Sequence, residues 1–268
     1  MNKKIGPFFG SSMLAGLLLL SATPSRASHA APPAESVSEY ESNLRFFYKT
    51  GQFQWAAEAR ARWEYANLLP YRDLTLGPYY RLHKNLKVGA FYRIQQGARH
   101  DDDWVEPRKG EWIWQDTSRR SEHVFILDAT PRMELPIGSR GSWVGALKNQ
   151  YLIDTFNNHR TYKLRPELNY FWMKGLNPFM NFFVHYEVYF PLNYGVSSIY
   201  ETWLYTGGLY HYKQNVSLGG YLALRDAIWG SSADWKKQSS EDYRVKYKAN
   251  VIGLLVIFEF SGPKAEAS

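Results

Sequence analysis

FQWAAEARARWEY, residues 53–65, has two faces of opposite character. Side chains of a β-strand alternate between its faces, so Phe53, Trp55, Trp63 and Tyr65 share one face on which only alanines separate the aromatic ends. The other face carries glutamate and arginine. At ~3.3 Å per residue and a tilt near ~40°, the two tryptophans lie roughly 20 Å apart along a membrane normal, close to the ~25 Å apolar band of an outer-membrane barrel. The stretch predicts a membrane strand with aromatic rings at both interfaces and small side chains facing lipid.

Composition agrees with a barrel better than with a helical membrane protein. A mean hydropathy of −0.44 excludes a helical membrane bundle. It does not exclude a barrel, because every second residue of a barrel strand faces the interior and its polar side chain lowers the mean hydropathy of the strand. The chain has 10 Trp, 20 Tyr and 15 Phe, an aromatic content that suits interfacial girdles. We therefore expect an all-β protein with a single transmembrane antiparallel β-barrel.

The N-terminus has the form of a secretory signal peptide. Two lysines precede the apolar run 13–20, and small residues around Ala27 or Ala30 form cleavage sites. Cleavage after Ala27 removes three basic residues and no acidic residue, so the net charge falls from +7 to +4, which gives little support to nucleic-acid binding. The chain has no cysteine, which excludes disulfides and a lipidated cysteine anchor. Localisation in the outer membrane is the expectation.

Alternating segments and turn signals predict ten strands, with twelve as the alternative count. The predicted strands are 53–65, 73–82, 86–96, 119–135, 143–153, 162–172, 180–190, 199–212, 216–228 and 242–260. Short turns alternate with longer loops, among them 97–118 and 230–241. An even count places both ends of the chain on the periplasmic side, where the short turns of bacterial barrels lie. The expected organisation is a signal peptide 1–27, a periplasmic leader 28–52, a barrel 53–260 and a tail 261–268.

Two features depart from a regular pattern. In the last strand, the apolar register moves between Tyr247 and Ile252, which predicts a bulge near residues 249–250. Pro78, Pro131 and Pro166 fall at outward positions inside strands. Because proline lacks the N–H that a ladder needs, each requires a bulge or an unpaired site.

Internal similarity carries a resemblance to a known class of proteins. Residues 77–89, GPYYRLHKNLKVG, resemble residues 207–219, GGLYHYKQNVSLG, and both read as a strand, a turn and a returning strand. With the signal peptide and the terminal aromatic strand, these units resemble a family of Gram-negative outer-membrane barrels of unknown function, over about residues 53–260. The resemblance implies no activity. It implies that the last strand is an assembly signal for the barrel-assembly machinery, formed by Ile252, Leu254, Val256, Phe258 and Phe260, although the tail 261–268 departs from that pattern.

The expected interior face is crowded with charge. Its main members are Glu58, Arg60, Arg62, Arg81, Arg93, Asp128, Arg132, Lys163, Arg165, Glu167 and Arg225. In a narrow barrel these groups either pair and fill the interior or line a small pore whose excess of positive charge prefers anions.

Catalytic and metal-binding alternatives rest on a few residues. Ser121 and His123 share one strand face near the expected outer rim, and His185 lies two residues from Glu187. Asp101, Asp102 and Asp103 cluster in the 97–118 loop, where carboxylates could hold Ca²⁺, although their spacing matches no known loop and a solvated acidic tip is the simpler interpretation. We expect no cofactor.

Three functions stay open. The first is an integral outer-membrane barrel with a structural or small passive pore role, in contact with outer-membrane lipid and lipopolysaccharide. The second is an outer-membrane lipid-modifying hydrolase. The third is a secreted soluble β-barrel or sandwich that binds a ligand, with the apolar faces turned inward. The aromatic and alanine face of residues 53–65 favours the membrane over the third.

Overall fold

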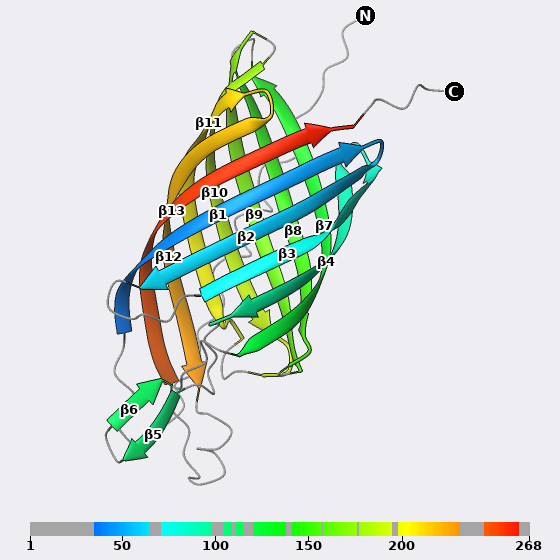
Figure 1. The fold of residues 1–268 in the computed structure, drawn as a ribbon. Helices are drawn as coiled ribbons and strands as arrows, with labels where there is room; N and C mark the ends of the chain where they lie inside the picture. Colours follow the sequence, from blue (N-terminus) through cyan, green and yellow to red (C-terminus); the bar gives the residue numbers. More distant parts are fainter. Residues whose placement is uncertain are drawn as a thin grey trace, which may run out of the picture.

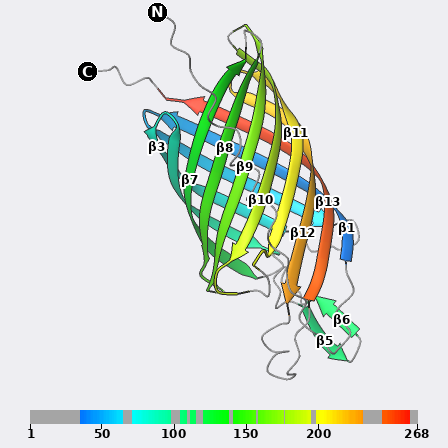
Figure 2. The ribbon, with the colours of Figure 1, turned by 180° about the vertical axis from the view of Figure 1, so that it is seen from behind.

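A computed structural model describes residues 35–64, 71–97, 104–108, 111–114, 120–137, 141–156, 158–175, 177–194, 198–230 and 244–262. Eleven of the strands found there close into one barrel, and two short strands form a separate hairpin (Figures 1 and 2). The strands are β1 (Glu35–Thr50), β2 (Phe53–Glu64), β3 (Tyr71–His83), β4 (Leu86–Gln96), β5 (Trp104–Arg108), β6 (Glu111–Trp114), β7 (Ser121–Ile137), β8 (Gly141–Asp154), β9 (His159–Lys174), β10 (Asn177–Pro191), β11 (Glu201–Lys213), β12 (Val216–Gly230) and β13 (Arg244–Ser261). Within the described ranges, no helix is long and apolar enough to cross a membrane.

The barrel closes between β1 and β13, which run parallel. Tyr40 of β1 pairs with Trp63 of β2 on one side and with Ile252 of β13 on the other. In a barrel of sequential hairpins with an odd strand count, the first and last strands run in the same direction, so they meet as a parallel pair. The all-β barrel is confirmed, but the predicted count of ten or twelve strands is wrong.

The extra strand comes from the segment expected to be a periplasmic leader. Residues 35–50 of the expected 28–52 leader form β1, a full member of the wall. The expectation that both ends of the barrel lie on one side rested on an even count, and it is also wrong. β1 begins at the end with the long loops, whereas β13 finishes at the opposite end.

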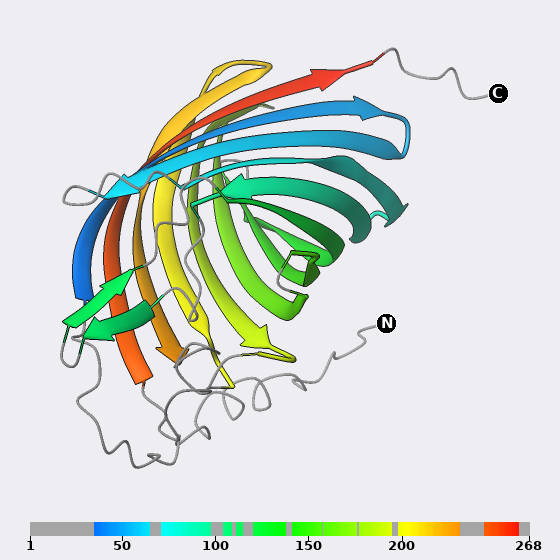
Figure 3. The same ribbon diagram turned by 60° about the horizontal axis from the view of Figure 1, so that its bottom comes forward.

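The two ends of the barrel, here called the turn end and the loop end, differ in the length of their connections. At the turn end, residues 51–52, 84–85 and 214–215 make two-residue turns. At the loop end, the connections include 97–120 and 231–243. Figure 3, with the loop end forward, shows the β5–β6 hairpin outside the barrel wall at this end.

Strand alternation gives the barrel an apolar outside and a polar inside. On β2, Phe53, Trp55 and Trp63 are exposed outward, while the side chains of Glu58 and Arg60 form ion pairs inside. The same alternation continues around the wall. Exposed outward side chains include Tyr40, Phe46, Tyr48, Leu74, Leu76, Tyr92, Ile94, Phe125, Leu127, Leu168, Trp172, Phe182, Val184, Leu204, Tyr210, Leu222, Leu224, Ile252, Leu254 and Phe260.

Pro78, Pro131 and Pro166, the three prolines predicted to lie inside strands, interrupt the strand pairing without shifting its register. Pro78 keeps its pairing with β2, but the β3–β4 pairing skips from Leu76 to Tyr79. Pro131 and Pro166 lie at equivalent gaps in β7–β8 and β9–β10. The unpaired sites are the outcome expected for proline in a ladder. Beside the Pro131 gap, the Asn149 side chain donates to the Ala129 carbonyl over 3.2 Å.

The predicted bulge in the last strand is absent from the described β12–β13 ladder, which runs in one register from Val216 to Gly230. Tyr247 and Val251 point inward and are almost fully buried, whereas Ile252 and Leu254 point outward. The apparent change of register arises because β13 is apolar inside near the loop end and apolar outside near the turn end.

Candidate functional site

The interior of the barrel holds the main charged residues predicted to face it. Their alternation with outward neighbours places all of them on the inner side of the wall, with Arg81 and Arg132 near the turn end. This set comprises Glu58, Arg60, Arg62, Arg81, Arg93, Asp128, Arg132, Lys163, Arg165, Glu167 and Arg225.

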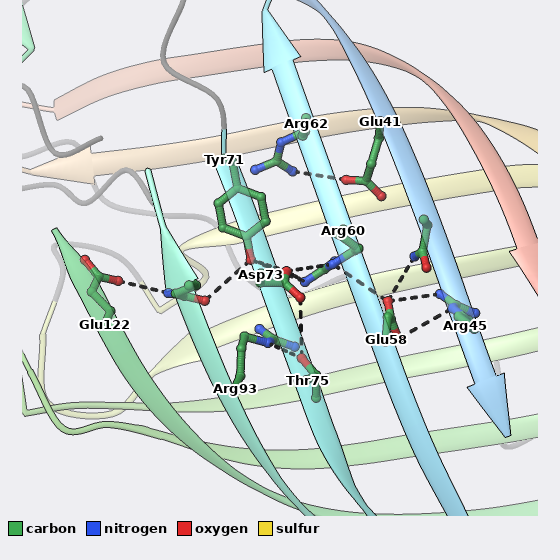
Figure 4. Close-up of polar contacts among 12 residues, drawn as sticks. Glu41, Arg45, Glu58, Arg60, Arg62, Tyr71, Asp73, Thr75, Arg93 and Glu122 are labelled. Carbon is green, nitrogen blue, oxygen red and sulfur yellow. Dashed lines mark hydrogen bonds and ion pairs between the residues drawn. The ribbon is translucent and has the colours of Figure 1, made fainter. Parts of the chain in front are cut away.

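Arg60 links a first ion-pair group (Figure 4). Its guanidinium lies 2.7 Å from the Asp73 carboxylate and 3.7 Å from Glu58. The Tyr71 hydroxyl donates to Asp73 over 2.6 Å, and Arg45 lies 3.4 Å from Glu58. Since β1, β2 and β3 are neighbours, their register alone brings these side chains together.

Arg62 and Arg225 form a second group across the closing seam. Arg62 lies 3.3 Å from Glu39 on β1, and Arg225 lies 2.7 Å from Glu201 on the adjacent strand. Both guanidinium groups lie over the Trp203 ring, with their central carbons 5.0 and 5.1 Å from its centroid, within the range of cation–π attraction. Arg225 also lies 3.6 Å from Glu39, so the first strand is tied both to β2 and, across the seam, to β12.

Glu187 anchors a third group. It lies 3.3 Å from Lys163 and 3.0 Å from Arg165, and the Tyr189 hydroxyl donates to it over 2.7 Å. Arg165 also donates to Glu167 over 2.6 Å. A buried carboxylate needs such partners, because desolvation of an unpaired charge costs several kcal/mol.

Two interior cations are held by neutral side chains, and Arg93 joins the first group only through Thr75, whose hydroxyl donates to Asp73 over 3.4 Å (Figure 4). Arg93 donates to the Thr75 hydroxyl over 2.9 Å, and the Lys87 ammonium lies 4.1 Å from the centre of the Tyr79 ring. Among the described residues, neither forms an ion pair.

Three cavities follow one another along the barrel. A central cavity of about 290 Å³ lies between a loop-end cavity of about 150 Å³ and a turn-end cavity of about 60 Å³. The central and loop-end cavities share Arg60, Arg93 and Tyr205 in their linings. The central and turn-end cavities share Tyr79 and Lys87. These shared side chains lie where one cavity meets the next, and each set includes a cationic group.

Cations outnumber carboxylates around the central cavity. The basic residues in its lining are Arg45, Arg60, Lys87, Arg93, Lys148, Lys163 and Arg165, and the acidic residues are Glu41, Glu58, Glu167 and Glu187. A dissolved anion is thus favoured over a dissolved cation in this space.

The Ser121 and His123 pair is not assembled as a hydrolase centre. Ser121 accepts a hydrogen bond from the Gln96 side chain over 2.6 Å, and His123 Nδ1 contacts the Tyr92 hydroxyl. Both residues lie on the outer face of β7. Neither contacts the other, and no carboxylate of the described residues contacts His123.

His185 and Glu187 face the central cavity but have separate partners. His185 lies 3.4 Å from the Asn169 side-chain oxygen and stacks on Phe183, while Glu187 is occupied by its cations. In the described part of the chain, His, Asp and Glu side chains form no group of three that suits a metal ion. Asp101, Asp102 and Asp103 lie outside the described residues.

The predicted assembly strand lies at the closing seam. Phe258 stacks on Phe46 of β1 with ring centres 4.9 Å apart, and Phe260 pairs in register with Tyr48. Ile252, Leu254 and Val256 point outward on the same strand.

Sequence reasoning missed Glu39, Glu41 and Asp73. The first two fall in the segment assigned to a leader, and the third stands at the boundary of a predicted strand. The alternation of glutamates with Tyr40 in residues 39–41 was the signal that could have found them. Their partners follow only from register, as with Tyr247, whose hydroxyl donates to Glu39 over 2.6 Å.

Comparisons with protein-family models, with curated proteins and with solved structures found no match to this chain.

Proposed function

We propose that this protein is an integral outer-membrane β-barrel whose interior forms a narrow passive pathway that prefers anions. The observation that carries the proposal is the inversion of polarity across the wall, which has exposed apolar side chains outside and ion pairs inside. A water-soluble protein rarely exposes a contiguous apolar surface larger than a few hundred Å². In a bilayer, the apolar outer surface of the barrel would contact lipid chains and not water.

The order of residues along the outer face supports a membrane setting. Tyr40 and Trp63 stack near the loop end, with ring centres 6.5 Å apart, and Tyr48 and Trp55 pair in register near the turn end. On β2 only alanines point outward between the two tryptophans. Transmembrane barrels carry aromatic girdles of this kind at both interfaces.

The ends of the barrel support an orientation. Bacterial barrels have short turns in the periplasm and longer loops outside, so the turn end is proposed to face the periplasm. The N-terminal signal pattern is consistent with export. The apolar wall is proposed to contact outer-membrane lipid and, near the loop end, lipopolysaccharide, and β13 to be recognised by the barrel-assembly machinery.

The interior supports a narrow pathway with anion preference. Neighbouring cavities share lining residues from one end to the other, and Tyr205 and Tyr79 lie where one cavity meets the next. Arg93 and Lys87, which form no ion pair within the described residues, stand at these two points.

Fractionation tests the membrane proposal. The protein should sediment with outer membranes, stay there after a urea wash and dissolve in detergent, with a heat-dependent change in gel mobility. Release of the protein by osmotic shock without detergent would contradict the proposal and favour a soluble binding protein.

The hydrolase alternative is tested with the variants Ser121→Ala and His123→Ala. Mass spectrometry should show the same acyl-chain composition of lipopolysaccharide in cells with either variant as in cells with the parent protein.

A further inference from the structure

The two halves of the barrel interior differ in how their cations are neutralised. Toward the loop end, Arg60, Arg62 and Arg225 each lie within 3.3 Å of a carboxylate oxygen. Toward the turn end, the basic side chains form no ion pair within the described residues. These are Lys49, Arg81, Lys84, Lys87 and Arg132.

These five residues line one space. The turn-end cavity is bounded by all of them, together with His83 and Tyr79, and its described lining contains no aspartate or glutamate. Arg132 donates to the Lys84 carbonyl over 3.3 Å, which fixes one of the guanidinium groups beside the β3–β4 turn. The cavity of about 60 Å³ has room for several water molecules.

Lys87 connects this space with the central cavity. Its ammonium lies 4.1 Å from the centre of the Tyr79 ring, and the Lys148 ammonium lies 5.9 Å from the same centre. Lys148 has Asp128 at 3.4 Å, so Lys87 is the uncompensated member of the two. A line of positive charge therefore leads from the turn end past Tyr79 into the interior.

Clustered cations without carboxylates repel one another and gather counter-ions from solution. One multiply charged anion can replace several monovalent ions, and charge-assisted hydrogen bonds from guanidinium groups suit phosphate and carboxylate oxygens. Because the lining side chains face the interior of the barrel, the anion must arrive dissolved in water.

We propose that the turn-end cavity is a binding site for a small, multiply charged anion that carries phosphate or carboxylate groups. In the orientation of the proposed function, on which this point rests, the site opens to the periplasm. The binding itself requires only the folded barrel. Arg81 and Arg132 hold the anion at the mouth, and Lys87 receives its inner end.

The test is calorimetric titration of the protein folded in detergent micelles with sodium tripolyphosphate at constant ionic strength. Saturable binding is expected. The double variant Arg81→Gln/Lys87→Gln should weaken it at least tenfold. The matched control Lys174→Gln/Lys213→Gln removes the same charge from turn-end residues that do not line the cavity, and it should keep the affinity within about twofold. Heat-dependent gel mobility verifies that each variant is folded, and Lys84→Gln with Arg132→Gln is a second cavity variant.

Absence of saturable binding by the folded parent would overturn the site, as would equal weakening in the cavity and control variants. The result is independent of the proposed function. A barrel that resides in the outer membrane and conducts, but does not bind tripolyphosphate, would refute the site alone. A barrel that binds tripolyphosphate but is released without detergent would refute the membrane proposal alone.

Discussion

The guanidinium of Arg60 on β2 lies 2.7 Å from the carboxylate of Asp73 on β3, whose side chain is completely buried. This contact joins the second and third strands from inside the wall. It also lies where the central and loop-end cavities meet, because Arg60 lines both.

Replacement of Arg60 by Met should destabilise the barrel strongly, since it removes the ion pair of the buried Asp73 carboxylate and leaves it with hydrogen bonds from the Tyr71 and Thr75 hydroxyls alone. A loss of about 3–5 kcal/mol in the free energy of unfolding is expected for breaking a buried ion pair. Urea unfolding in lipid vesicles measures it. The double variant Arg60→Met/Asp73→Leu should recover most of the loss, because it removes both charges. A single variant as stable as the parent would show that Asp73 carries no buried charge.

Arginine in place of Ala59 tests which face meets lipid. Ala59 points outward midway between Trp55 and Trp63, and a cation at the bilayer midplane of a barrel costs about 2–4 kcal/mol. Asn250→Arg, at an exposed outward position near Lys248, is the control and should cost at most about 1 kcal/mol. Equal thermal stability of Ala59→Arg and the control would contradict the assigned membrane position.

Phe46 and Phe258 stack across the parallel seam, and their coupling tests whether the seam exists. A double-mutant cycle with alanine at each position should give a coupling energy of about 0.5–1.5 kcal/mol, as for other aromatic pairs. Folding in vesicles followed by urea unfolding supplies the four values. A coupling energy of zero would indicate that β1 and β13 are not neighbours.

Cysteine labelling tests the odd strand count, and the chain has no native cysteine to interfere. Ser36→Cys, at the loop end of β1, should react with a membrane-impermeant maleimide on intact cells. Gln214→Cys, in a turn-end connection, should react only after permeabilisation. If neither position reacts with the maleimide in intact cells, the result would contradict the odd strand count and support the ten-strand arrangement with a periplasmic leader.

Most wall strands were predictable because the pattern that defines them is local. Alternation with a period of two and polar turns located the strands near their observed bounds, including residues 86–96, which coincide with β4. The same alternation separated the outward face of Phe53 and Trp55 from the inward face of Glu58 and Arg60.

Closure was not predictable from local pattern alone. Residues 39–48 alternate as other strands do, but an even count was assumed because bacterial barrels normally close antiparallel. The parallel contact between β1 and β13 joins residues about two hundred positions apart in the sequence. Alternation with a period of two does not indicate whether a neighbouring strand runs parallel or antiparallel. The interior ion pairs share this limit, since Arg225 reaches Glu39 only after the seam has formed.

Where both faces of a strand carry apolar residues, the sequence does not indicate which face points into the barrel. In β13, buried Tyr247 and outward Ile252 belong to opposite faces, and the change from one to the other resembles a bulge in the sequence. Only the unbroken register with β12 separates these two explanations.

Ionic selectivity tests the central claim most directly. The protein is inserted into a planar bilayer, and the reversal potential of single-channel current is measured in a potassium chloride gradient. A small, steady current with the sign of chloride permeation is expected, because Arg93 and Lys87 lie where neighbouring cavities of the interior meet. A folded, inserted barrel that carries no current, or one with a potassium-selective reversal potential, would contradict the account.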